Sequence, residues 1–171
     1  MFHKNIKLAL AILTLGFAVY QFIISSIGNG IALTLLAGMF VFLYFKNEMI
    51  LLGFLQMRKQ NFQGTKKWLD RIKNPEAALT RKQQGYYNYL HGLILSQENM
   101  TRAEKYFKRA MNLGLSMKHD LAMCKLNLAG IAMSKRRKRE AQKLLKEAKQ
   151  LDKHNMMTEQ IQMMKQQMKK I

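Results

Sequence analysis

The sequence is poor in several residue types, and each shortage narrows the classes of protein to which it can belong. Its 171 residues include one cysteine, Cys124, so no internal disulfide can form and a reducing compartment suits the chain. No segment shows the sustained alternation of apolar and polar residues that marks a half-buried strand. The sequence therefore predicts an all-α fold.

Acidic residues are also scarce, with 10 Asp and Glu against 29 Lys and Arg. The few carboxylates are scattered among cations, which suits surface pairing better than acid–base catalysis. The histidines lack the paired spacing of metal ligands: His3, His91, His119 and His154. Cys124 lies in an apolar helical pattern without a nearby basic activator, and no glycine-rich phosphate loop is present. We predict no catalytic, metal-binding or cofactor-binding residues, and no enzyme.

The first part of the chain has no charge over 38 consecutive residues, Leu8–Phe45. One helix of that length would measure ~57 Å, whereas the hydrocarbon core of a bilayer is ~30 Å thick. Two crossings fit better, with a turn at Ser25–Gly30, where Gly-Asn-Gly favours a reversal. We predict a membrane anchor over residues 1–46, with spans at about 7–27 and 31–46.

Positive charges flank this hairpin on both sides and are absent from its loop. The flanking residues are His3, Lys4 and Lys7 before it, and Lys46, Arg58 and Lys59 after it. The positive-inside rule predicts cytoplasmic N- and C-termini, in a bacterial inner membrane or an equivalent one. A cleaved secretory signal ending near Ala18 is the alternative, but the apolar run continues through Ile24. We expect the second span to continue directly into Met49–Met57.

The rest of the chain repeats with a period of 38 residues. The recurring apolar and small positions mark one helix face in each copy: Thr65, Leu69 and Ile72; Ala103, Phe107 and Ala110; Ala141, Leu145 and Ala148. The preceding halves recur as well, so we predict three helix pairs over 47–154, at about 47–74, 80–115 and 117–153.

Local signals set the expected helix ends. They are capping boxes at Thr80 with Gln83 and at Thr101 with Glu104, a terminating glycine at Gly114, and a helix start at Asn74 and Pro75. The last segment, 155–171, carries a narrow apolar stripe that suits a capping helix over the end of the stack. The alternative for this segment is a methionine-rich helix that receives a partner helix or lies on a membrane.

The spacing of Ala103, Phe107 and Ala110, and of Ala141, Leu145 and Ala148, resembles the second helix of a tetratricopeptide repeat. Gly92 and Gly130, eleven residues before the first alanines, agree with this. The period exceeds the family's ~34 residues. The resemblance implies an α-solenoid whose first helices line a groove for a protein or peptide. By similarity that groove would present Glu48, Leu51, Tyr86, Tyr89, Cys124 and Asn127. Packing of the tyrosines inside the array is the equal alternative.

Five adjacent cations, Lys135, Arg136, Arg137, Lys138 and Arg139, form a second candidate surface at the turn within the last pair. Residues 46–171 carry 27 Lys and Arg against 10 Asp and Glu, an excess that implies an acidic partner. The basic turn is expected to meet solvent alone, anionic lipid or, less favoured, nucleic acid. We expect a membrane-anchored scaffold or adaptor for other proteins on the cytoplasmic face. The alternative is a basic membrane tether for nucleic acid or ribosomes.

Overall fold

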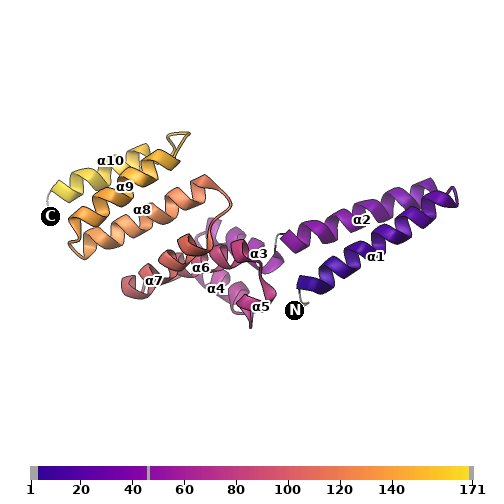
Figure 1. The fold of residues 1–171 in the computed structure, drawn as a ribbon. Helices are drawn as coiled ribbons and strands as arrows, with labels where there is room; N and C mark the ends of the chain where they lie inside the picture. The colour runs from indigo at the N-terminus through magenta and orange to yellow at the C-terminus, as the bar shows by residue number, and fades with distance from the viewer. Residues whose placement is uncertain (1–3, 46, 170–171) are drawn as a thin grey trace. The chain divides into compact units, whose positions relative to one another are not determined.

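The computed structural model describes residues 4–45 and 47–169, and within these ranges the chain is helical without strands (Figure 1). It divides into two compact units, Met1–Gln83 and Gln84–Ile171. The helices are α1 (Lys4–Ile23), α2 (Ile27–Phe45), α3 (Glu48–Arg58), α4 (Phe62–Leu69), α5 (Pro75–Ala78), α6 (Arg81–Leu95), α7 (Met100–Leu113), α8 (Lys118–Ser134), α9 (Lys138–Leu151) and α10 (Thr158–Lys169). The predicted all-α class is confirmed.

The first two helices lie side by side as a hairpin (Figure 1). Within α2, the 18 residues Ile27–Tyr44 are long and apolar enough to cross a membrane, while the apolar stretch of α1, Leu8–Ile23, is shorter. Among the described residues, α2 is therefore one candidate span, close to the predicted 31–46.

The predicted position of the hairpin turn is wrong by a few residues. The chain reverses at Ile24–Ser26, where Ser25 adopts a left-handed conformation with φ of 62°, and the Gly-Asn-Gly sequence belongs to the first turn of α2. The glycine is needed for packing instead: a Cβ atom on Gly30 would lie 2.7 Å from the Phe22 ring. Helix-to-helix approach thus explains Gly30 better than turn formation does.

The expected direct continuation of α2 into the next helix is also wrong. Lys46 lies outside the described residues, and Asn47 begins a new helix as the N-cap of α3. The Asn47 side chain accepts a hydrogen bond of 3.0 Å from the Met49 amide. An Asn cap satisfies one of the free amides at a helix start, so a break is stabilised here despite the apolar residues on both sides.

Helices α3 and α4 pack as a pair. The buried Thr65 hydroxyl hydrogen-bonds the carbonyl oxygens of Asn61, at 2.9 Å, and Gly53, at 3.2 Å. Thr65 can therefore replace the alanine found at the equivalent positions of the later pairs, because its polar group has partners. The expected helix start at Pro75 is confirmed by α5, and the Thr80 amide donates to Gln83 Oε1 at 2.9 Å, as a capping box requires.

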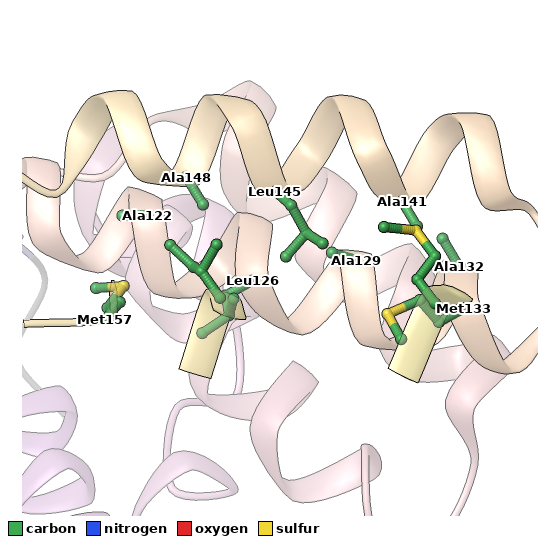
Figure 2. Close-up of a cluster of buried hydrophobic side chains, with 11 residues drawn as sticks. Ala122, Leu126, Ala129, Ala132, Met133, Ala141, Leu145, Ala148 and Met157 are labelled. Carbon is green, nitrogen blue, oxygen red and sulfur yellow. The ribbon is translucent and has the colours of Figure 1, made fainter. Parts of the chain in front are cut away.

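The core of the second unit lies mainly between α8 and α9, and α10 completes it (Figure 2). Ala141, Leu145 and Ala148 of α9 point toward α8 and are fully buried. Ile161 and Met168 of α10, together with Met157 just before this helix, are buried in the same cluster. The apolar stripe of α10 therefore packs inside the second unit.

The 38-residue period has a counterpart in burial. At each of two recurring positions every member is completely buried: Thr65, Ala103 and Ala141 at the first; Leu69, Phe107 and Leu145 at the second. The second helices of the pairs therefore bury the same face. Gly92 and Gly130 occupy equivalent positions of the repeat but have different neighbours. Gly92 lies against the Phe107 ring, whereas Gly130 lies near Met164 of α10.

One capping prediction is wrong. Helix α7 begins after Asn99, whose side chain accepts a hydrogen bond of 3.0 Å from the Arg102 amide, so Thr101 is already helical. Glu104 is consequently not a capping residue and has other partners. The predicted end at Gly114 is confirmed, since Gly114 follows Leu113 with φ of 89°.

Candidate functional site

The predicted groove residues lie in both units. Glu48 and Leu51 belong to α3 in the first unit, while Tyr86, Tyr89 and Asn127 belong to the second. Leu51 is 46% exposed and Leu55, one turn later, is 47% exposed, so α3 presents an apolar stripe. The Asn127 amide donates to the Met123 carbonyl at 2.8 Å within its own helix.

The two tyrosines of the predicted groove, Tyr86 and Tyr89, are buried in the second unit. Tyr86 donates a hydrogen bond of 2.7 Å to Asp120 Oδ2 and accepts one of 3.3 Å from the Met117 amide. Burial, followed by the Asp120 hydrogen bond, raises the pKa of Tyr86 to about 12. Tyr89 is 5% exposed, and desolvation raises its pKa as well. The burial of both agrees with the alternative that the sequence left open.

The basic turn does not present five free cations. Its Lys135 Nζ and Arg137 Nη1 lie 2.6 and 2.9 Å from the carboxylate of Glu104. Lys108 Nζ contacts the same carboxylate at 2.7 Å. These hydrogen bonds, that of Lys108 foremost, lower the pKa of Glu104 to about 2 despite its burial. One carboxylate thus joins α7 to the turn between α8 and α9.

The backbone of the turn fixes this arrangement. The amides of Arg136 and Arg137 donate to the Met133 and Ala132 carbonyls, at 2.9 and 2.8 Å, and Arg136 has φ of 57°. This closure ends α8 in the manner of a Schellman motif without a glycine. Of the five cations, Arg136, Lys138 and Arg139 are exposed without an ion pair in the described part of the chain.

A basic surface that the sequence analysis missed lies on α7. A depression of about 390 Å³ is lined by Arg102, Lys105, Tyr106, Lys108 and Arg109. The spacing of these residues along one helix was visible in the sequence, but the run at 135–139 has a higher local density of charge. Glu104 pairs with Lys135 and Arg137 of that run and with Lys108 of α7, while Arg102, Lys105 and Arg109 have no ion pair among the described residues.

Cys124 is completely buried, and its thiol lies 3.5 Å from the Phe107 carbonyl oxygen as a weak donor. Desolvation raises the pKa of this thiol to about 12. Such a thiol is a packing residue rather than a nucleophile. Across residues 4–45 and 47–169, no group of His, Cys, Asp and Glu side chains has the arrangement of a metal site.

Comparison with known proteins adds no relative: no family model matches the chain, and neither a curated protein nor a solved structure is similar to it.

Proposed function

We propose that the chain is a membrane-anchored scaffold or adaptor, with an N-terminal hairpin in the bilayer and helix pairs on the cytoplasmic side that bind another protein. The observation that carries the proposal is the reversed distribution of side chains in the hairpin. Ala11, Ala18 and Ala37 are buried between the helices, whereas large apolar side chains point outward. The outward residues include Ile12, Leu13, Phe17, Ile23, Leu35 and Phe42.

This distribution fits lipid better than water. Water-soluble helices bury their large apolar side chains, because that removes the most apolar surface from water. Helices in lipid gain nothing from such burial and pack closely through small residues. Leu35, 72% exposed, and Ile23, 76% exposed, would form part of an apolar patch far larger than a monomeric soluble protein carries.

The pairing of α1 with α2 favours an anchor over a cleaved signal. A signal peptide is removed and has no lasting partner, whereas here the Phe22 ring closes over Gly30 of the second helix. Two antiparallel spans would place both ends of the hairpin on the same side of the membrane. The flanking cations favour the cytoplasmic side.

The scaffold role rests on the helix pairs and on the exposed apolar stripe of α3. Leu51 and Leu55 share one helix face with the predicted groove residue Glu48, at positions three and seven residues apart. Apolar positions in this register are the usual means by which a helix surface receives a partner. We further propose that the helix pairs form an array that resembles tetratricopeptide repeats.

The test combines topology with membrane association. Reporters fused to each terminus should both read cytoplasm, while a reporter inserted at Ser25 should read the opposite side. The full chain should resist alkaline extraction and retain an N-terminal tag. An external C-terminus would overturn the orientation, and loss of the tag would show a cleaved signal instead.

The second candidate is a membrane tether for nucleic acid or ribosomes, favoured by the unpaired exposed cations on α7 and α9. Binding of this kind weakens steeply with salt because counterions are released. A scaffold for a protein partner would lose binding on Leu51→Asp and Leu55→Asp substitution. A nucleic-acid tether would tolerate those changes and lose binding in moderate salt.

A further inference from the structure

The outer face of α7 carries three cations in helical register. Arg102, Lys105 and Arg109 are exposed and spaced three and four residues apart, so their side chains project from one face. They make no ion pair in the parts of the chain that the structure describes, whereas Lys108 on the same helix bonds Glu104. At the turn, by comparison, two of the five cations are bound to the Glu104 carboxylate.

These cations surround a recess. The α7 depression, about 390 Å³, is lined by them together with Lys108 and Tyr106. Two of the lining groups are guanidinium forks, which match the geometry of phosphate oxygens better than ammonium groups do. The exposed lysines of α9, Lys143, Lys146 and Lys149, offer ammonium groups alone.

We propose that the outer face of α7 binds the phosphate groups of anionic phospholipids and holds the second unit against the membrane surface. The inference rests on the proposed membrane anchor, which keeps the unit within reach of a negatively charged leaflet. Each cation near such a surface contributes about 1 kcal/mol, or roughly fivefold in the docking equilibrium. Three unpaired cations supply roughly a hundredfold preference for docking.

Lipid is favoured over nucleic acid by the position of Tyr106. Single-stranded nucleic acids gain much of their affinity by stacking bases on free aromatic faces. The Tyr106 ring is half-buried and stacked on His91, with centroids 5.4 Å apart and planes 26° apart. One ring face is therefore already covered, and the recess offers phosphate contacts more readily than base contacts.

The experiment uses the full chain labelled at one place. Thr101→Cys puts an exposed thiol on α7, whereas Cys124 is completely buried with a pKa raised to about 12 and stays unlabelled. An environment-sensitive fluorophore at position 101 is quenched by a headgroup-linked quencher when α7 meets the bilayer. The protein is reconstituted in vesicles of phosphatidylcholine, with or without phosphatidylglycerol.

Quenching should appear with phosphatidylglycerol and fall as salt shortens the screening length toward ~8 Å. In a variant with Arg102→Gln, Lys105→Gln and Arg109→Gln the docking constant should fall about a hundredfold. The matched control removes the same charge from α9, with Lys143→Gln, Lys146→Gln and Lys149→Gln, and should stay within a few-fold of the unaltered chain. Arg102→Lys with Arg109→Lys separates loss of charge from loss of guanidinium geometry.

Equal losses in the two triple variants would refute the α7 site, since net charge alone would then explain docking. Equal quenching without phosphatidylglycerol would refute it as well. If polyuridylate, added in place of phosphatidylglycerol, changed the fluorescence at position 101, the outer face of α7 would bind nucleic acid instead of lipid. Flotation of the chain with phosphatidylcholine vesicles tests the anchor separately: a chain that floats but does not dock overturns this inference alone. If the chain does not float, the anchor fails, and the same variants compared by co-sedimentation with acidic vesicles still decide the α7 site.

Discussion

The carboxylate of Glu104 should stabilise the second unit, because it holds three cations from two places in the chain. Its side chain is 11% exposed, and Lys108, Lys135 and Arg137 each contact it within 2.9 Å. Replacing it by glutamine keeps the size of the side chain and removes the charge. Three cations then face one another without their shared counterion, apart from the more distant Glu140.

The magnitude follows from the lowered pKa. A fall from the ordinary 4.5 to about 2 corresponds to an upper limit of about 3 kcal/mol, at about 1.4 kcal/mol for each pKa unit. Lys108 and Arg137 are 50% and 46% exposed, so water compensates part of the loss when the carboxylate is gone. We expect Glu104→Gln to lower the free energy of opening of the unit by about 1–2 kcal/mol near neutral pH.

Amide hydrogen exchange of the full chain measures this quantity locally, which avoids treating a chain of two compact units as two-state. The amides of α7 and α9 should exchange roughly tenfold faster in the variant. Because the folded pKa is below the unfolded one, the stabilisation is complete above pH 4.5 and is lost as the pH falls toward about 2. The difference between the two proteins should shrink over the same interval.

Glu140→Gln is the internal control. Glu140 is 39% exposed and lies 3.5 Å from Arg137 and 3.9 Å from Lys108, so its loss should cost less than about 0.5 kcal/mol. Equal effects of the two substitutions at neutral pH would refute the central role of Glu104. A Glu104→Gln effect that stays constant down to pH 2 would attribute the loss to packing rather than to charge.

Two further predictions concern packing and capping. Ala148→Leu should overpack the fully buried contact with α8 and cost ~1–3 kcal/mol, whereas Lys149→Leu on the exposed side should cost little, as measured by exchange protection of α9. Asn99→Ala should cost about 1 kcal/mol of α7 stability by removing the cap, while Thr101→Ala should be nearly neutral; the reverse order in the same assay would restore the capping box that the sequence suggested.

The buried face of α4, α7 and α9 was predictable from the sequence, because small and large apolar residues recur there at the spacing of one helix face. Ala103, Phe107 and Ala110 lie on one face of an α-helix with 3.6 residues per turn, so a helix that packs through this face buries all three. The ends of the helices were harder to predict from the sequence. Asn99 and Thr101 are both good caps, and the choice between them depends on which residues must face the neighbouring helix.

The hairpin turn was misplaced for a similar reason. Glycine suits turns and close helix contacts equally, and the sequence around Gly30 does not separate the two uses. The separation requires knowing that the Phe22 ring occupies the space where a side chain would be. The positive φ of Ser25 is a tertiary outcome as well, since nothing in the residue type demands it.

The basic turn illustrates how a linear run of charge differs from a charged surface. Lys135 and Arg137 are 31 and 33 residues away from Glu104 along the chain, so no local pattern reveals their pairing. At the turn the pairing holds two of the five cations, whereas Arg102, Lys105 and Arg109 of α7 have no ion pair among the described residues. Removing Glu104 should therefore release positive charge at the turn and strengthen docking to acidic vesicles, even as it destabilises the unit. Opposite effects of one substitution on stability and on lipid affinity would be difficult to explain if the five turn residues were free from the start.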